Sequence, residues 1–254
     1  SPTIDRKDSI QNTMRLFAIG DLHLSGNPPK KPMDVFGPRW KNHWQRIQDD
    51  WRNRVTDEDT VLIAGDTSWA MHLKEAQEDL DGIRALPGQK IIIRGNHDYW
   101  WDSAGKLNRM DAANHMTYLY GTTKVIDNGR IAICGTHGWI CPGDIHYKED
   151  HDAKPYRREL LRVERTLEEA QKLGCEHTIL LLHYPPVCDL TKPSGFTELL
   201  EKYHVPLCVF GHLHGMEPNT MFPRRYNGTL LQLVSADYRD CKLLEITFDE
   251  KDKS

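Results

Sequence analysis

The chain has 254 residues, of which 39% are hydrophobic and 28% charged, with a formal net charge of -4 and a pI near 6.3. This composition is typical of a globular protein with a sizeable core, and it excludes a strongly basic chain that attracts nucleic acid or anionic membranes by bulk charge. The six cysteines show no CxxC spacing, which predicts reduced thiols rather than a disulfide framework. No apolar run is long enough to cross a bilayer, so we expect a cytoplasmic protein that does not bind a membrane.

The first thirteen residues, Ser1 to Thr13, are polar and lack the apolar core of a signal peptide. We therefore expect a leader or a disordered extension over residues 1–13. Met14 stands directly before the first strand-like run and is a candidate for the natural start. No linker or internal repeat divides the remainder, which predicts a single domain over residues 14–254.

Short apolar runs recur along the chain, and each ends in a polar turn. The runs that end in this way span residues 16–19, 61–64, 91–93, 178–182 and 207–210. This rhythm is typical of buried sheet strands that deliver functional loops at their carboxyl ends.

Helical segments separate most of these runs and are closed by Gly or Pro in several cases. The expected helices span residues 39–54, 73–86, 103–113, 156–173 and 195–203. Strands that alternate with helices predict an α/β fold. The alternation breaks at residues 124–126 and 131–134, which flank the hairpin turn signal Asp127-Asn128-Gly129, and again in the strand-rich segments 230–235 and 242–248. Mixed sheets, and a second sheet, are therefore expected.

The polar ends of the runs supply carboxylate, amide and imidazole groups, which suit divalent ions such as Mn, Fe and Zn. The residues concerned are Asp21, His23, Asp66, Asn96, His183, His212 and His214. The Asp-x-His and His-x-His spacings place alternate side chains on one side of an extended segment. Any one of these residues alone is as consistent with a turn or a surface side chain, but burying the whole set without a metal would be costly. The set therefore predicts a metal centre.

The motifs that contain these residues resemble the five ordered motifs of the calcineurin-like metallophosphoesterase superfamily. They are Gly20-Asp21-Leu22-His23, Gly65-Asp66, Gly95-Asn96-His97-Asp98, the isolated His183 and Gly211-His212-Leu213-His214. The resemblance spans roughly residues 15 to 214. It implies a four-layer α/β/β/α sandwich, in which two mixed β-sheets are flanked by helices.

The resemblance also implies a role for each motif residue. The first metal would be held by Asp21, His23 and His214, the second by Asn96, His183 and His212, and Asp66 would bridge both. The two divalent ions, Mn, Fe or Zn, would share a hydroxide that attacks phosphorus. His97 would contact the phosphate and protonate the leaving oxygen, while Asp98 would orient His97 and raise its proton affinity. In the alternative, His97 and Asp98 are solvated turn residues.

One position departs from the family pattern. Many members carry another Asp three residues after the bridging one, where this chain has Trp69. That Asp is not a metal ligand in the usual scheme, so the metal site should survive, whereas loop support and access for the substrate should differ. The aromatic residues near the motifs are candidates to stack on a base or an aromatic leaving group, or simply to pack the loops: Trp69, Tyr99, Trp100, Trp101 and Trp139.

Two further features concern substrate binding. Arg94 and the pairs Arg157-Arg158 and Arg224-Arg225 are candidates to meet a second phosphate or a polar tail of the substrate, with ordinary surface charge as the alternative. We place the second pair in a loop. The polar stretch from Gly138 to Lys154 is expected to be a loop and is a candidate lid. Its His146 and His151 match no strong metal motif, which favours a solvated loop over a third metal.

These observations predict a binuclear metal-dependent phosphohydrolase that cleaves a small phosphomonoester or phosphodiester. A nuclease shares the metal chemistry but needs a continuous basic groove, which the near-neutral composition does not favour. A non-catalytic binding protein of the same fold should have lost ligands or His97, and all of them are present. The sequence leaves open the substrate, the native metal pair and the oligomeric state.

Overall fold

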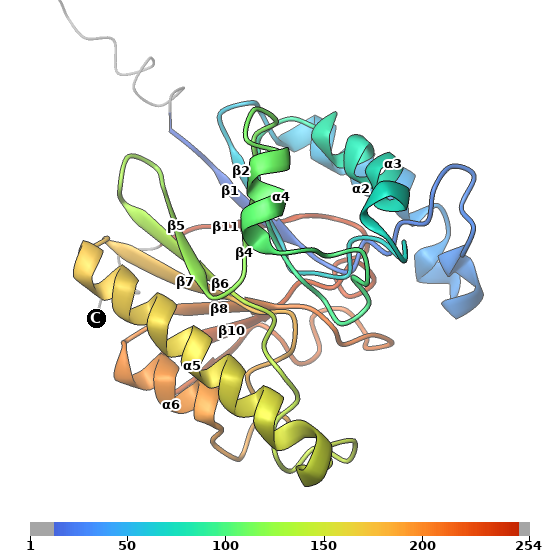
Figure 1. The fold of residues 1–254 in the computed structure, drawn as a ribbon. Helices are drawn as coiled ribbons and strands as arrows, with labels where there is room; N and C mark the ends of the chain where they lie inside the picture. The colour runs from blue at the N-terminus through green and yellow to red at the C-terminus, as the bar shows by residue number, and fades with distance from the viewer. Residues whose placement is uncertain (1–12, 249–254) are drawn as a thin grey trace, which may run out of the picture.

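Two β-sheets pack face to face in the computed structural model, which describes residues 13–248 (Figure 1). Helices α2, α3 and α4 cover the outer face of one sheet, and α5 and α6 cover the outer face of the other. This is the α/β/β/α arrangement expected from the sequence, so the predicted fold class is confirmed. The expectation of a leader or extension over residues 1–13 lies, apart from Thr13, outside the described residues.

The first sheet has the strand order β11-β1-β2-β3-β4. Its four parallel strands are β1 (Leu16–Ile19), β2 (Thr60–Ile63), β3 (Gln89–Ile93) and β4 (Met116–Leu119), and β11 (Leu244–Ile246) pairs antiparallel with β1. The helices on its outer face are α2 (His43–Arg54), α3 (Leu73–Arg84) and α4 (Ala104–Met110). Because both faces of this sheet are covered, its central strands are apolar throughout rather than alternating.

The second sheet has the order β5-β6-β7-β8-β10-β9. Strands β6 (Ile131–Gly135), β7 (His177–Leu181), β8 (Leu207–Phe210) and β10 (Thr229–Leu233) are parallel, and β5 (Thr122–Ile126) and β9 (Arg224–Tyr226) are antiparallel edges. Helices α5 (Glu149–Leu173) and α6 (Gly195–Lys202) pack on it. The two sheets are therefore both mixed, as predicted.

The apolar core forms three layers. The central layer lies between the sheets and includes Leu62, Ile91, Ile133 and Leu181, all nearly inaccessible to solvent. The outer layers join each sheet to its helices, around Trp51 on one side and around Phe196 on the other. This packing fixes the parallel strands rigidly, so the loops at their carboxyl ends are held in place. No helix among residues 13–248 is long and apolar enough to span a membrane.

Several predicted boundaries differ from the structure. The hairpin is confirmed, with Ile126 paired to Ile131 and with Asp127 and Asn128 at φ 54 in its turn. Helix α5 begins at Glu149 and not at Tyr156, where the sequence predicted its start. Pro155 lies inside the helix, although proline usually interrupts one. The last part of the predicted loop 138–154 is therefore helical.

The second arginine pair was also misplaced in the sequence interpretation. Arg224 and Arg225 lie in the edge strand β9 and not in a loop. The proline before them, Pro223, precedes the strand, which is a position that proline tolerates at a sheet edge.

Candidate metal centre

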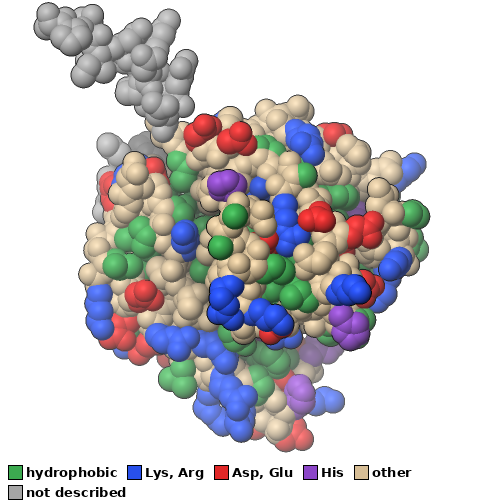
Figure 2. All heavy atoms as spheres, turned by 45° about the horizontal axis from the view of Figure 1, so that its top comes forward, with side chains coloured by type: hydrophobic (Ala, Val, Ile, Leu, Met, Phe, Trp, Pro, Cys, Tyr) green, Lys and Arg blue, Asp and Glu red, His purple; other side chains and the backbone are tan. Residues whose placement is uncertain are grey.

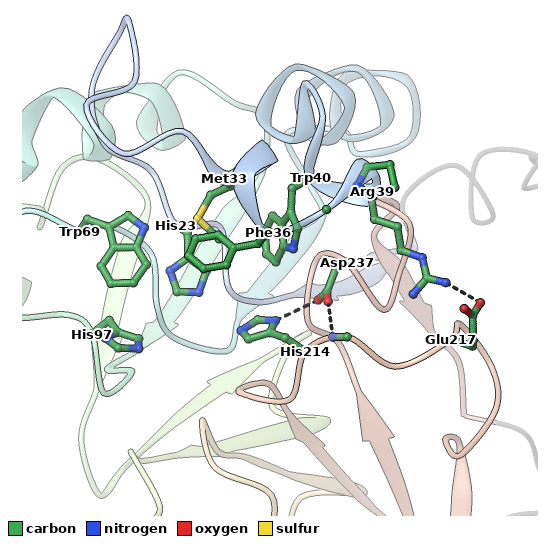
Figure 3. A pocket seen from close by; sticks show the side chains of 13 residues that line it. His23, Met33, Phe36, Arg39, Trp40, Trp69, His97, His214, Glu217 and Asp237 are labelled. Carbon is green, nitrogen blue, oxygen red and sulfur yellow. Dashed lines mark hydrogen bonds and ion pairs between the residues drawn. The ribbon is translucent and has the colours of Figure 1, made fainter.

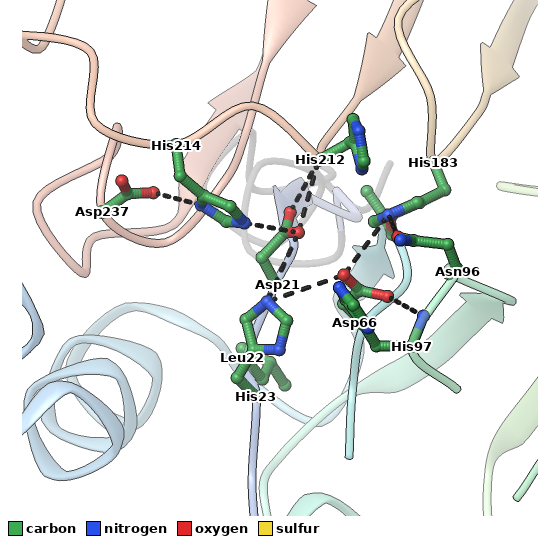
Figure 4. Close-up of polar contacts among 12 residues, drawn as sticks. Asp21, Leu22, His23, Asp66, Asn96, His97, His183, His212, His214 and Asp237 are labelled. Atoms are coloured by element: carbon green, nitrogen blue, oxygen red, sulfur yellow. Dashed lines mark hydrogen bonds and ion pairs between the residues drawn. The ribbon is translucent and has the colours of Figure 1, made fainter. Parts of the chain in front are cut away.

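Polar residues from both sheets meet at one rim of the sandwich (Figure 4). They follow β1, β2 and β3 of the first sheet and β7 and β8 of the second. Two groups of side chains have donor atoms within 4.8 Å of one another, namely Asp21, His23 and His214, and Asp21, Asp66 and His183. The structure thus brings together side chains that are far apart in the sequence, as the motif pattern predicted.

Asp66 belongs to the second group and also lies close to His23 of the first. Its Oδ2 atom is 3.6 Å from Nε2 of His23 and 3.4 Å from Nε2 of His183. Nε2 of His183 is also 2.8 Å from Oδ1 of Asn96, so Asn96 belongs to the same cluster. Asp21 Oδ1 lies 3.3 Å from Nε2 of His214. Asp21 is the carboxylate common to both groups, so the assignment of the bridge to Asp66 stays a prediction.

His212 lies beside the cluster but is oriented differently. Its backbone N–H donates to Asp21 Oδ2 at 3.1 Å, while its ring packs against Tyr184 with 4.4 Å between ring centroids. Its ring is also 5.2 Å from that of His183. Its side chain belongs to neither group of metal-capable side chains found among the described residues. The role of His212 as a ligand of the second metal therefore remains a prediction.

Two motif glycines are required by crowding around the carboxylates. A Cβ atom on Gly95 would lie 2.1 Å from Oδ1 of Asp66, and one on Gly211 would lie 2.3 Å from Oδ2 of Asp21. Real Cβ atoms do not approach so closely, so only glycine lets these backbones pass beside the carboxylates. The glycines in these motifs therefore make room for the cluster.

The backbone of the predicted ligands is strained. Asp21, His23 and Asp66 have φ values of 56°, 47° and 53°, in the left-handed region that residues other than glycine rarely adopt. Two backbone hydrogen bonds help to hold this conformation. The N–H of Asp21 donates to the carbonyl of Gly65 and the N–H of His23 donates to the carbonyl of Asp66, each at 2.9 Å. Such strain concentrates at functional sites, because the surrounding fold must impose it.

Among the described residues, the charge of the cluster is balanced by imidazoles and not by Lys or Arg. Asp21 and Asp66 are 0% and 1% exposed, and in the described part of the chain no Lys or Arg forms an ion pair with either. Burial alone would lower the pKa of His214, but the nearby Asp21 and Asp237 raise it to about 10. Burial likewise opposes protonation of His183, and Asp66 raises its pKa to about 9. Protons on these imidazoles occupy positions for which a metal ion would compete.

A metal ion fits this donor set. Burial lowers the pKa of His23 to about 4, so its imidazole is neutral, and its Nδ1 atom is buried without a hydrogen-bond partner among the described residues. The other ring nitrogen, Nε2, lies 3.8 Å from Asp21 Oδ1 and 3.6 Å from Asp66 Oδ2, and two buried carboxylates side by side are unfavourable for the protein alone. Divalent cations bound to imidazole, carboxylate and amide oxygen would remove that cost.

Asp237 is a functional residue that the sequence interpretation missed. Its carboxylate is 2% exposed, contacts Nδ1 of His214 at 3.0 Å and accepts the N–H of Gly215 at 3.0 Å. A carboxylate on the far ring nitrogen fixes the tautomer and orientation of a ligating histidine. The signal was present, because Asp237 follows strand β10 as the predicted ligands follow theirs.

His97 lies at the edge of the cluster and is partly exposed. Trp69 packs on it with 4.6 Å between ring centroids, and its Nδ1 atom is 3.3 Å from the hydroxyl of Tyr99. Trp69 also stacks on His23 at 4.8 Å. Trp69 thus occupies the position where many family members have Asp, and it supports two site histidines through ring contacts rather than through charge.

Asp98 does not orient His97, contrary to the sequence prediction. Its buried carboxylate accepts five N–H groups, from the backbone of Asp66, Thr67, Ser68 and Gly95 and from the indole of Trp100. The carboxylate is turned toward these donors because so many N–H groups converge on it. Asp98 therefore ties the loop after β2 to the loop after β3 and holds Asp66 in position.

The other aromatic, histidine and arginine residues singled out from the sequence lie outside the metal cluster. Trp100 and Trp101 are core residues, 2% and 9% exposed, and Tyr99 is exposed beside His97. Trp139 donates to Asp152 at 3.1 Å. Neither His146 nor His151 belongs to a metal-capable group among the residues described. The arginines singled out from the sequence, Arg94, Arg157, Arg158, Arg224 and Arg225, do not line the cavity beside the cluster.

That cavity has a volume of about 590 Å³ and opens directly from the cluster (Figure 3). His23, His97 and His214 line one side of it. Met33 and Phe36 line it as well, and the sequence interpretation did not single them out. They lie in a proline-rich segment without a recognisable motif, so only the tertiary structure shows that they face the site.

The comparison with protein families agrees with this geometry. The model of the calcineurin-like phosphoesterase family matches residues 14–216, and the chain belongs to this family. Its members are generally metal-dependent phosphoesterases that bind two divalent metals. A search of curated protein sequences found no match.

Solved structures share the fold at low sequence identity. A protein of unknown function, AQ665 from Aquifex aeolicus, aligns with a TM-score of 0.52 and 19% identity over 91% of this chain and 95% of its own. The protein TT1561 of Thermus thermophilus gives 0.52 and 10% identity over 92% and 99%. The calcineurin-like phosphoesterase YfkN from Bacillus subtilis gives 0.50 and 14% over 88% and 82%. These similarities concern the fold alone.

Proposed function

We propose that the protein is a binuclear metal-dependent phosphohydrolase that cleaves a small phosphomonoester or phosphodiester. The observation that carries this proposal is the pair of buried carboxylates, Asp21 and Asp66, which are surrounded by imidazoles from both sheets and have no Lys or Arg as partner in the described structure. A site whose buried carboxylates are balanced only by imidazoles, which can give up their protons to a metal, is suited to bind external cations.

The proposed ligands follow the family motifs. The first metal would bind Asp21, His23 and His214, the second Asn96, His183 and His212, with Asp66 shared between them. This mixture of oxygen and nitrogen donors suits Mn, Fe or Zn. When bound, the two ions supply Lewis acidity, which acidifies the attacking water and offsets the charge on the phosphoryl oxygens.

The protein's own groups orient the substrate and move the proton. His97 lines the cavity outside the two donor groups, so its imidazole can bind the phosphoryl group and give a proton to the leaving oxygen. Trp69 and Tyr99 contact its ring and limit its rotation. Asp98 and Asp237 hold the Asp66 loop and the His214 ring, so the donor groups are fixed before the substrate arrives.

A nuclease is the less favoured candidate. Figure 2 shows Lys and Arg side chains gathered in the lower half of the face drawn, with Asp and Glu above and beside them, whereas a nuclease would need a continuous basic groove that leads to the metals. Among the described residues that line the cavity, Arg39 is the single Lys or Arg, and it is paired with Glu217. The local charge therefore fits a small phosphoester better than a polynucleotide.

A reduced, intracellular environment is part of the proposal. All six cysteines lie within residues 13–248 and none forms a disulfide. Proteins of oxidising compartments commonly carry disulfides, so free thiols, two of them partly or largely exposed, favour the cytoplasm.

A substrate panel tests the activity. Metal-stripped protein is assayed with added Mn²⁺ against p-nitrophenyl phosphate, bis-p-nitrophenyl phosphate and 2′,3′-cyclic nucleotides. We expect turnover of at least one, and we expect Asp66→Asn to lose bound metal and at least about a thousandfold in kcat/KM, or about 4 kcal/mol of barrier. Asp49→Asn, on the exposed face of α2, is the matched control and should change neither quantity. Absence of turnover, together with unchanged metal content in Asp66→Asn, would overturn the proposal.

A second variant tests the proton donor. His97→Ala should keep its metals, because His97 is outside the two donor groups, but it should lose roughly a hundredfold or more in kcat on esters with poor leaving groups. The loss should be smaller on p-nitrophenyl phosphate, whose leaving oxygen needs little protonation. Equal rates for wild type and variant on a poor leaving group would remove His97 from the mechanism.

A further inference from the structure

The cavity beside the metal centre has a far wall of apolar and aromatic side chains. Met33 and Phe36 belong to a 3-10 turn, η1 (Met33–Phe36), and Trp40 belongs to the next, η2 (Pro38–Trp40). Figure 3 shows Phe36 and Trp40 on the side of the cavity opposite His97, with His23 between them and Trp69. A ligand that leaves the metal centre toward this wall meets aromatic side chains on both sides.

This wall is held firmly against the rest of the site. Trp40 is 4% exposed, and its ring lies 5.5 Å from that of His214. The guanidinium of Arg39 donates to the carbonyl of Met216 at 2.7 Å and pairs with Glu217. The turns η1 and η2 therefore form part of the cavity wall and are anchored to the loop that carries His214.

Phe36 is exposed although its ring lines the cavity. It is 68% accessible to solvent, which is an unusual value for a large apolar side chain that lines a cavity. The free energy of an exposed phenyl ring improves when another apolar surface covers it, at roughly 25 cal/mol for each Å² removed from water. An aromatic ring in the cavity would provide that cover.

The charges in the cavity are already paired. Arg39 faces Glu217, and Asp237 contacts His214 and the N–H of Gly215. Of the described residues that line the cavity beyond the metal ligands, none offers an unpaired cation to a second phosphate. A multiply phosphorylated leaving group would lose its hydration there without a partner.

The position of His97 sets the direction of the substrate. In the proposed function His97 protonates the leaving oxygen, so that oxygen lies near its ring. Trp69 packs against His97 at 4.6 Å and also lines the cavity. The remainder of the leaving group must then pass Trp69 and extend toward Phe36.

We propose that the substrate is a phosphoester whose leaving group is an uncharged aromatic ring system. This inference rests on the proposed function and names its substrate class. In the reaction the oxygen of water bonds to phosphorus and the bond between phosphorus and the leaving oxygen breaks. The aromatic alcohol departs with a proton from His97, and the proton released by the attacking water replaces it. The volume of about 590 Å³ lies within the range typical of small-molecule pockets.

The test measures how strongly the cavity favours a larger aromatic leaving group. Because the same two substrates are compared in wild type and variant, the difference in their intrinsic reactivity cancels. The Mn²⁺-loaded protein is assayed with 2-naphthyl phosphate and phenyl phosphate, or with their methyl phosphodiesters, whichever class it hydrolyses. The ratio of the two kcat/KM values is compared between wild type and Phe36→Ala. We expect the variant to reduce the naphthyl preference by about two- to tenfold, as for the loss of one aromatic contact. Phe36→Tyr retains an aromatic ring and should keep the wild-type preference for the naphthyl ester. Phe36→Leu lacks the ring and should show a smaller preference than wild type.

Two controls sharpen the result. Val35→Ala changes a neighbouring side chain that is 75% exposed and does not line the cavity, so the ratio should stay at the wild-type value. Glu217→Gln frees Arg39 and should raise the ratio of kcat/KM for 4-carboxyphenyl phosphate over phenyl phosphate, because the new anion then finds a cation.

The outcomes separate the two proposals. If neither ester and no member of the earlier panel is hydrolysed, the proposed function fails and this inference fails with it. If esters are hydrolysed but the naphthyl to phenyl ratio is the same in wild type and Phe36→Ala, the proposed function stands and the aromatic leaving group is refuted.

Discussion

Two buried carboxylates in loops beside the first sheet differ in how the chain balances their charge. Asp111, just after α4, is 0% exposed and is bound by Arg84 at 2.8 and 3.1 Å, by the hydroxyl of Tyr118 at 2.6 Å and by Asn114 at 2.9 Å. Asp21, just after β1, is also 0% exposed. Its charged contacts among the described residues are to histidines alone.

The difference separates a structural acid from one that could hold a metal. Asp111 has an arginine that cannot be deprotonated, so its charge is neutralised inside the fold at every ordinary pH. Asp21 and Asp66 are balanced by imidazoles, which lose their protons or exchange them for metal. Burial alone therefore does not mark a functional carboxylate; the identity of its cationic partner does.

The largest expected effect concerns the structural acid. Arg84→Met should leave Asp111 buried without a cation and lower the free energy of unfolding by about 3–5 kcal/mol. Denaturant unfolding of the metal-free protein measures this loss. Arg130→Met is the control, because Arg130 is 51% exposed and its pairs with Asp127 and Glu176 lie on the surface, where little change is expected. Equal stabilities of Arg84→Met and wild type would remove the distinction between the two acids.

The next effect concerns the binding acids. Mn²⁺ added to the metal-stripped protein at a hundred times its Kd should raise the free energy of unfolding by about 2.7 kcal/mol for each site. Asp21→Asn should lose most of this gain, while Arg84→Met, although less stable, should keep it. Thermal unfolding at several Mn²⁺ concentrations gives the values. An unchanged Tm across the titration would show that the cluster needs no cation.

Acid should affect the structural pair in a defined direction. Burial raises the pKa of Asp111, but the hydrogen bonds from Arg84, Tyr118 and Asn114 outweigh it, and the pKa lies below its usual value. A carboxyl group with a lowered pKa stabilises the fold above the unfolded pKa of about 3.9, and this contribution is lost as the pH falls through the folded pKa. The difference in unfolding free energy between wild type and Asp111→Asn should thus be constant above about pH 5 and shrink below about pH 4. A difference that grew on acidification would contradict the assignment.

The smallest effect concerns the aromatic support of the site. Trp69→Phe should lower kcat on an ester with a poor leaving group by about two- to fivefold, because a smaller ring restrains His97 less well. Stability should change little, since the indole N–H of Trp69 is buried without a partner in the described structure and its removal offsets the lost contact. Tyr99→Phe separates the ring contact from the hydrogen bond near His97. A larger loss in Tyr99→Phe would transfer the orienting role to the hydroxyl.

The fold and most of the metal cluster could be predicted from the sequence because both depend on local patterns. Each apolar run that ends in Asp or His is a strand whose carboxyl end lies at the same rim, as for Asp21 and His183. Parallel strands deliver such residues to one place whatever the connections between them. Sequence order and strand polarity were thus sufficient to bring the side chains together.

The predictions that were wrong or incomplete concern features that depend on the direction of a side chain or on contacts between residues distant in the sequence. Asp98 follows His97 directly, but its carboxylate turns to the loop after β2, and adjacency in sequence gave no sign of this. Asp237 and Phe36 reach the site from segments without a motif. The predicted helix began at Tyr156, whereas α5 begins at Glu149 and continues through Pro155.

The contact between His214 and Asp237 has a consequence for biosynthesis. The first proposed metal site combines Asp21, near the beginning of the described chain, with His214 and the carboxylate of Asp237 near its end. A nascent chain emerges from the ribosome over many seconds, and through most of that time it offers Asp21 and His23 without their partners. Correct loading of the proposed metal site must therefore wait until His214 and Asp237 have been synthesised, and an ion captured earlier would be held by an incomplete set of ligands.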